Sequence, residues 1–141
     1  MIVSEVMTAQ VVTAKPSSTV KEVAATMARI ESGAVPVVDD NKLVGLITDR
    51  DIVIRVVAEG LGLDTKAADV MTEGVETCRE DDNVADAVAK MGSKQIRRLV
   101  VVNDQGRHVG MLSLGDVAVD YGAKAVGKTL EQISEGAPSA H

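Results

Sequence analysis

Two short segments of this 141-residue chain place a hydroxyl and a carboxylate at a spacing that suits a sugar phosphate. Gly45-Leu46-Ile47-Thr48-Asp49-Arg50-Asp51 and Gly110-Met111-Leu112-Ser113-Leu114-Gly115-Asp116 share one order: glycine, two apolar residues, a hydroxyl, two variable positions and an aspartate. At the start of a helix, main-chain N–H groups and the helix dipole attract an anion, and the hydroxyl can donate to it. An aspartate one turn later can accept from both hydroxyls of a ribose. A nucleotide supplies ribose and phosphate together, so it is the ligand class that these segments favour.

The same spacing has a structural interpretation. A hydroxyl followed three positions later by an acid forms a capping box where a helix begins. The pairs Thr48–Asp51 and Ser113–Asp116 therefore fit a helix cap as well as a ligand site. Gly45 and Gly110 lack Cβ, and we expect them to let a ligand lie close against a strand.

The two segments belong to a duplication that covers most of the chain. Shifting the sequence by 64 positions aligns Glu5-Val6-Met7-Thr8 with Asp69-Val70-Met71-Thr72 and Val37-Val38 with Val101-Val102. We expect repeats at residues 1–62 and 63–122, followed by a tail at residues 123–141. Two repeats are too few for a solenoid, so we expect face-to-face packing about a pseudo-two-fold axis, with two equivalent clefts between them.

Each repeat predicts a helix, a β-hairpin and a second helix, which is an α+β fold. The first helices begin at Thr19 with Glu22 and at Asn83 with Asp86, which have N-cap and N3 spacing. Paired short apolar runs around polar turns predict the hairpins. These runs are residues 35–38 with 43–47, and residues 99–102 with 109–112. The second helices are expected at residues 49–59 and from residue 114 onward.

Composition excludes several classes of protein. A net charge of −6 and a single aromatic residue, Tyr121, argue against nucleic acid as a partner. Cys78 is the only cysteine, and no Cys/His cluster has the spacing of a metal site. No apolar run approaches the roughly 20 residues that span a bilayer, and the N-terminus has no signal-peptide pattern. We therefore expect a cytoplasmic protein without membrane contact.

The duplicated segments resemble the CBS (cystathionine β-synthase) domain, and the tandem pair is similar to a Bateman module. The resemblance runs from Val3 to Tyr121 and includes the Val-Met-Thr openings and the strand Val35-Pro36-Val37-Val38. It implies a β-α-β-β-α fold for each repeat, with the repeats packed through their sheets. It also implies a regulatory, energy-sensing module that binds AMP, ADP, ATP or S-adenosylmethionine in the clefts between repeats.

The resemblance also implies residue roles. The aspartates Asp51 and Asp116 would hold the ribose, and the hydroxyls of Thr48 and Ser113 would lie near phosphate or ribose. The adenine pocket would be lined by two strand segments and two threonines: Val35, Pro36, Val37, Leu99, Val100, Val101, Thr13 and Thr77.

A basic pair distinguishes the second repeat. Arg97-Arg98 precedes its first hairpin strand and is similar to the pair that reaches phosphate in the regulatory γ subunit of AMP-activated protein kinase. Two guanidiniums can bind a phosphate bidentately, although a solvated surface pair is the alternative. The first repeat has Gly33-Ala34 there, and whether Arg50 or Arg55 compensates is open. We therefore favour the Ser113/Asp116 cleft for a phosphorylated ligand; the other is empty or takes a less charged one.

We interpret the chain as a stand-alone sensor that binds an adenine nucleotide and signals by conformational change, without a required cofactor. No recognisable base accompanies a nucleophile, so catalysis is not expected. We expect the apolar stripe Ile52, Val53, Val56 and Val57, with Val117 and Ala118 in the equivalent helix, to be mostly core. Its width leaves apolar surface to cover, which predicts homodimerisation through these helices, and an unknown effector protein would read the signal. A scaffold that binds no nucleotide is the leading alternative, and an enzyme acting on nucleotides is a third class.

Overall fold

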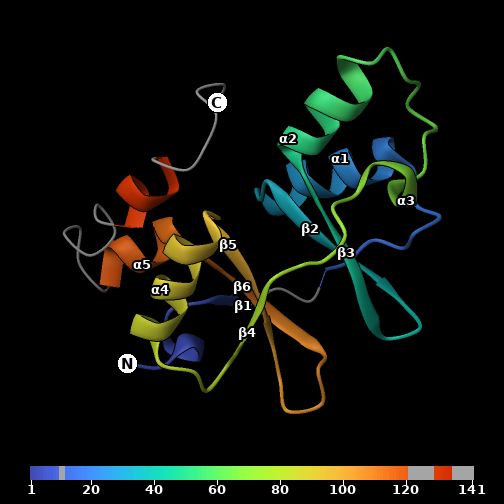
Figure 1. Cartoon of the computed structure of the whole chain (residues 1–141). Coiled ribbons are helices and arrows are strands. Elements are labelled where there is room, and N and C mark those ends of the chain that lie inside the picture. The colour runs from blue at the N-terminus through green and yellow to red at the C-terminus, as the bar shows by residue number, and fades with distance from the viewer. Residues whose placement is uncertain (10–11, 121–128, 135–141) are drawn as a thin grey trace. The chain divides into compact units, whose positions relative to one another are not determined.

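The computed structural model describes residues 1–9, 12–120 and 129–134, and the chain divides into two compact units (Figure 1). The N/C unit comprises Met1–Val11 and Glu76–His141, and the central unit comprises Val12–Val75. Of the expected tail at residues 123–141, residues 129–134 are helical, and the rest lies outside the described residues, as does Tyr121.

None of the helices in the described ranges has the length and apolar character needed to cross a membrane.

The central unit packs helices against a β-hairpin. Its elements are α1 (Val20–Ile30), β2 (Ala34–Asp39), β3 (Lys42–Thr48), α2 (Asp49–Ile52), the π-helical turn η2 (Val53–Val57) and α3 (Ala67–Val70). The predicted capping box starts α1, because Thr19 Oγ1 accepts from the Glu22 N–H and the Thr19 N–H donates to Glu22 Oε1, both at 3.2 Å. The hairpin turns at Asp40 and Asn41, whose φ angles of 50° and 63° are left-handed, as the twist of a tight hairpin requires.

The core of the central unit lies between the hairpin and its helices. Buried side chains come from α1, β2, β3, η2 and α3: Val20, Val23, Met27, Val35, Val37, Ile47, Val56, Ala67 and Val70, together with Ala14. Burial of these aliphatic groups is the main favourable term for this unit.

The N/C unit repeats this plan with a four-stranded sheet in the order β1-β6-β5-β4. Its elements are η1 (Val3–Glu5), β1 (Thr8–Ala9), β4 (Thr77–Arg79), α4 (Val84–Lys94), β5 (Arg98–Val102), β6 (His108–Ser113) and α5 (Leu114–Asp120). Asn83 caps α4 by accepting from the Ala85 N–H at 2.9 Å. Both units combine a hairpin with helices, so the predicted α+β class is confirmed.

Each Val-Met-Thr segment pairs with the hairpin of the other sequence repeat. In the N/C unit, β1 pairs antiparallel with β6, with Thr8 opposite Met111. In the central unit, Thr72 forms an antiparallel bridge with Leu46 of β3. The chain therefore crosses between units after Val11 and after Val75, and the residues just before each crossing cover the outer edge of a hairpin. Covering an edge strand in this way satisfies main-chain groups that would otherwise be unpaired.

Candidate functional site

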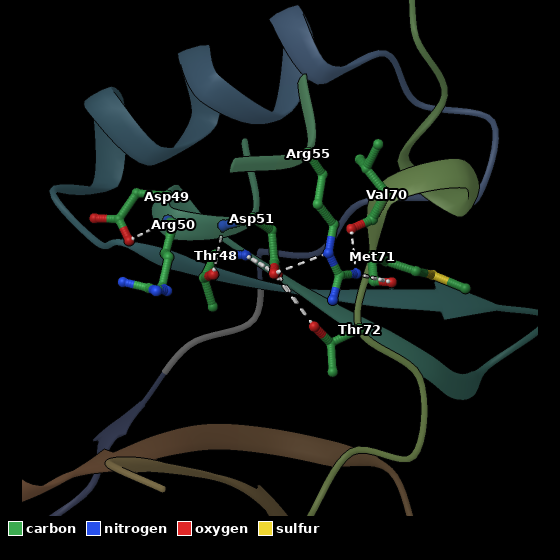
Figure 2. Close-up of polar contacts among 8 residues, drawn as sticks. All are labelled: Thr48, Asp49, Arg50, Asp51, Arg55, Val70, Met71 and Thr72. Atoms are coloured by element: carbon green, nitrogen blue, oxygen red, sulfur yellow. Dashed lines mark hydrogen bonds and ion pairs between the residues drawn. The ribbon is translucent and has the colours of Figure 1, made fainter. Parts of the chain in front are cut away.

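In the central unit, the candidate site is the corner where β3 passes into α2 (Figure 2). Thr48 is the N-cap, and its Oγ1 accepts from the Asp51 N–H at 3.1 Å. Asp51 Oδ2 accepts in return from the Thr48 N–H at 2.9 Å. The pair thus forms a complete capping box, so the structural interpretation of this motif holds.

The Asp51 carboxylate has further contacts besides the cap. The Thr72 hydroxyl lies 3.3 Å from Asp51 Oδ1 and 3.4 Å from Oδ2, and donates to the carboxylate. Arg55 Nε lies 3.9 Å from Asp51 Oδ1, and the Asp51 side chain is only 12% exposed. Figure 2 shows these groups converging on one carboxylate from three segments. The negative charge of Asp51 is therefore partly offset within its own unit.

Arg55 is directed towards this corner. Its Nη1 donates to the main-chain oxygens of Val70 and Met71, each at 3.0 Å, and fixes the guanidinium beside Asp51. The Arg50 side chain extends away from Asp51 in Figure 2. Of the two arginines left open by the sequence, Arg55 is thus the one beside the corner. Its guanidinium is therefore engaged by main-chain oxygens and by Asp51.

The N/C unit has an equivalent corner between β6 and α5. Ser113 Oγ accepts from the Asp116 N–H at 3.1 Å, and Asp116 Oδ2 accepts from the Ser113 N–H at 3.3 Å. The Thr8 hydroxyl donates to the same Oδ2 at 3.3 Å. Asp116 Oδ1 takes part in no hydrogen bond or ion pair with any residue that the structure describes. Among the described residues, this corner therefore leaves one carboxylate oxygen without a partner, whereas both oxygens of Asp51 are engaged.

Gly45 and Gly110 make room for the chain rather than for a ligand. A Cβ on Gly45 would lie 2.5 Å from Met71 Sδ and 3.1 Å from the Thr72 carbonyl oxygen. A Cβ on Gly110 would lie 2.6 Å from the Thr8 carbonyl oxygen and 2.9 Å from Met7 Sδ. The expectation that these glycines admit a ligand is therefore wrong. The space beside each is filled by a Val-Met-Thr segment.

The basic pair lies beside the second corner. Arg98 is opposite Ser113 in the β5–β6 ladder, and directly opposed side chains share one face of a sheet. Arg97 is exposed and Arg98 is half-buried. Within the described ranges, neither guanidinium forms a hydrogen bond or an ion pair. The matching partner of Thr48 is Ala34, which is 1% exposed, so the central unit has no cation at this position.

The structure divides the predicted adenine-lining residues into separate environments. The Val35 and Val37 side chains lie in the core of the central unit, and those of Leu99 and Val101 lie in the core of the N/C unit. Side chains alternate along a strand, so Pro36 and Val100 lie on the opposite face of each sheet. Of the six predicted strand residues, Pro36 and Val100 are therefore the ones on the face away from the helices.

The two predicted threonines differ in their local structure, since Thr77 belongs to a strand and Thr13 does not. Thr13 is exposed and precedes Ala14, which forms a parallel bridge with Val37. Thr77 opens β4 opposite Val100, and its main-chain oxygen accepts from Lys90 Nζ at 2.5 Å.

Sequence reasoning left two residues out of the candidate site and left a third open. Thr8 and Thr72, which contact the corner aspartates, carried a signal only as parts of the duplicated Val-Met-Thr segments, whereas Arg55 was one of two arginines whose direction the sequence did not give. Repetition of a polar residue next to buried apolar ones is a hint that it has a partner. Nothing in the spacing identified that partner.

Comparisons with known proteins place this duplicated arrangement among relatives. The family model described as CBS domain matches residues 3–58 and 67–120. The chain is 38% identical over 133 residues to the CBS domain-containing protein YhcV of Bacillus subtilis, covering 94% of each chain. It is similar to the CBS domain protein PAE2072 from Pyrobaculum aerophilum, solved in complex with AMP, at 29% identity and a TM-score of 0.78 over 93% of this chain and 98% of that one. The CBS domain pair of MJ0100, solved with 5′-methylthioadenosine and S-adenosyl-L-methionine, gives 29% identity and a TM-score of 0.78 over 88% and 98%.

Proposed function

Because this chain belongs to the CBS domain family, we propose that it is a non-catalytic regulatory module that binds an adenosine-containing ligand at its two strand-to-helix corners. The observation that carries the proposal is the duplicated corner, in which a hydroxyl and a carboxylate are held at the first turn of a helix in both units. The AMP, 5′-methylthioadenosine and S-adenosyl-L-methionine complexes of the similar proteins support this ligand class.

The chemistry of recognition follows from the atoms at each corner. A ribose has two neighbouring hydroxyls that can donate to one carboxylate, and hydrogen bonds to a charged acceptor are stronger than neutral ones. Asp116 and Asp51 would accept from this diol, and the Ser113 and Thr48 hydroxyls would lie towards the phosphate. The adenine ring would lie against the β-strands that precede each corner, near Pro36 and Val100 and beside Thr13 and Thr77.

The two corners differ in charge, and this difference predicts different ligands. Arg97 and Arg98 stand beside Ser113, where their guanidiniums are free of partners in the described part of the chain. At the other corner Arg55 is already bonded to main-chain oxygens and paired with Asp51. We therefore assign a phosphorylated adenine nucleotide to the Ser113/Asp116 corner. The Thr48/Asp51 corner would take an adenosine compound with less negative charge.

Exposed apolar side chains in and after η2 support the homodimer proposed from the sequence. Of the predicted stripe, Val56 is buried in the core, whereas Val53 and Val57 are 54% and 67% exposed. Leu61 and Leu63, which follow along the chain, are 48% and 64% exposed. A second copy that covers these side chains would remove apolar surface from water, and the module would then signal to an effector protein as a dimer.

Calorimetric titration with AMP, ATP and S-adenosylmethionine tests the proposal. The wild type should bind at least one of them, and Asp116→Asn should weaken AMP binding by about tenfold, because it replaces a charged acceptor with a neutral one of the same shape. Asp86→Asn, an exposed acid in the first turn of α4, is the matched control and should bind as the wild type does. Equal affinity in Asp116→Asn and the wild type would contradict the ribose role.

A specific observation favours the alternative function, an interaction scaffold without a ligand. Both carboxylates accept hydrogen bonds from the first residue of their own corner, as a plain helix cap does. Absence of binding by every compound, with a folded wild type, would favour the scaffold. Turnover of a nucleotide during prolonged incubation would instead identify an enzyme.

A further inference from the structure

Each corner aspartate also accepts a hydrogen bond from the Val-Met-Thr segment that lies just before the chain crosses to the other unit. Thr72 lies just before the crossing after Val75, and Thr8 lies just before the crossing after Val11. In each case a threonine hydroxyl donates to the corner carboxylate. The candidate ligand-binding group and the exit of the chain are thus joined by a single side-chain contact.

In the described part of the chain, the segment before the crossing makes more side-chain hydrogen bonds with its corner in the central unit than in the N/C unit. The Thr72 hydroxyl lies within 3.4 Å of both Asp51 oxygens, whereas the Thr8 hydroxyl is bonded to one oxygen of Asp116. Arg55 adds two hydrogen bonds to the same exit segment through the Val70 and Met71 oxygens. The main chain of Thr72 also exchanges hydrogen bonds of 2.8 and 2.9 Å with Leu46.

A ribose and Thr72 would compete for the same acceptor. The Asp51 side chain is 12% exposed, and its contacts are the Thr48 N–H, the Arg55 guanidinium and the Thr72 hydroxyl. The first belongs to the helix cap, and the second is anchored by two carbonyls. Thr72 is exposed and is held to Asp51 by the longest of these hydrogen bonds, so it is the contact that a diol can displace at least cost.

We propose that the Thr72 hydroxyl is a displaceable latch on Asp51: a ribose diol that takes the carboxylate frees Thr72 and loosens residues 72–76, the connection between the two units. The proposal rests on the proposed function, because it needs an adenosine compound at this corner. Thr72 is then a positioning residue: when a ligand binds Asp51, the loss of the Thr72 hydrogen bond changes the order of residues 72–76. At Asp116 a ligand can use Oδ1, which has no partner among the residues that the structure describes, so Thr8 need not be displaced there.

Affinity gives the first test, and its sign separates a latch from a structural contact. In an Asp116→Ala chain, where only the central corner remains, adding Thr72→Val should tighten binding of 5′-methylthioadenosine by about fivefold, the equivalent of one ordinary hydrogen bond. Adding Thr72→Ser, which keeps the hydroxyl, should leave the affinity unchanged.

Hydrogen exchange gives the second test. Saturation of the Asp116→Ala chain with 5′-methylthioadenosine should speed exchange at the bridging amides of Leu46 and Thr72, although a bound ligand normally slows exchange near its site. Thr72→Val should speed the same amides by about fivefold without ligand. Thr26→Val, which removes a threonine hydroxyl bonded within α1, is the matched control and should not change them.

The outcomes distinguish the latch from the proposed function. The latch alone is overturned if the wild type binds and if Thr72→Val, added to the Asp116→Ala chain, weakens binding or leaves it unchanged. The latch is also overturned if neither Asp116→Ala nor its Thr72→Val derivative binds while the wild type does. A wild type that binds no adenosine compound overturns the proposed function, and the latch with it.

Discussion

Arg98 and Ser113 are direct partners across the β5–β6 ladder, whereas the equivalent partners in the other unit are Ala34 and Thr48. The duplication has therefore kept the backbone of the corner and changed the charge beside it. An arginine on the face that carries the Ser113 hydroxyl can reach an anion held at that hydroxyl. A buried alanine cannot.

Arg98→Ala should weaken AMP binding by about tenfold, the size expected for one charge-assisted hydrogen bond to phosphate. Binding of 5′-methylthioadenosine, which has no phosphate, should be unchanged. Calorimetric titration of both ligands measures the difference, and Arg29→Ala, in the last turn of α1, is the control for loss of one positive charge. If the binding of AMP and that of 5′-methylthioadenosine weaken equally, Arg98 acts on the fold of the corner rather than on the phosphate.

The capping box of α1 predicts a dependence of stability on pH. Hydrogen bonds from the Thr19 N–H and hydroxyl lower the pKa of Glu22 below its ordinary value. Because this pKa is lowered on folding, ionised Glu22 contributes to the free energy of unfolding above the ordinary pKa, and the contribution is lost as pH falls through the lowered pKa. Glu22→Gln should therefore make the free energy of unfolding less dependent on pH below about pH 4.3.

Urea unfolding of wild type and Glu22→Gln across the acid range measures that change. Thr19→Ala removes the hydroxyl from the box but keeps the main-chain N–H that donates to Glu22, so it should flatten the profile less than Glu22→Gln does, with a loss of about 1 kcal/mol near neutral pH. Identical profiles for all three chains would show that Glu22 is not held by this cap in solution.

Local patterns in the sequence predicted much of this fold. The hydroxyl–acid spacings at Thr19, Thr48 and Ser113 describe contacts between residues three positions apart, so the sequence alone could locate those helix starts. The hairpins were equally predictable, because two apolar runs and a polar turn lie within a few residues of one another.

The rest of the site depends on contacts that no local spacing contains. Thr8 reaches Asp116 across 108 positions, and Thr72 reaches Asp51 across 21. Such pairs follow from the exchange of the Val-Met-Thr segments between repeats, which becomes visible only when the sheets are assembled. The misinterpretation of Gly45 has the same origin, because Met71 fills its space from a distant part of the chain.

Cys78 should be almost inert towards thiol reagents in the folded chain. It is buried in the core of the N/C unit, and that burial, with a smaller effect of Asp82, raises its pKa to about 11. Since the thiolate is the reactive form, reaction with Ellman's reagent at pH 8 should be slower than in the unfolded chain by on the order of a hundredfold. Cys78 is the only cysteine, so release of the coloured product reports this site alone. Fast reaction of the native chain would mean that the thiol lies on an open surface.

Substitution of the corner glycines by alanine tests whether they are needed for the close approach of the Val-Met-Thr segments, which affects stability even without a ligand. Gly110→Ala should destabilise the fold by about 2 kcal/mol, because its Cβ would lie 2.6 Å from a main-chain oxygen of Thr8 that cannot rotate away. Gly45→Ala should cost less, about 1 kcal/mol, since its nearest contact is the flexible end of Met71.

Gly115→Ala is the matched control for these two substitutions. Among the described residues, a Cβ there would meet only Ser113 Oγ, at an ordinary distance of 3.7 Å, and the residue lies within α5. Alanine is a better helix former than glycine, so this variant should be as stable as the wild type or more so. Urea unfolding of the three variants without ligand gives the order directly. A wild-type free energy of unfolding for Gly110→Ala would mean that Thr8 does not pack against β6 in solution, and the N-terminal segment would then lie elsewhere.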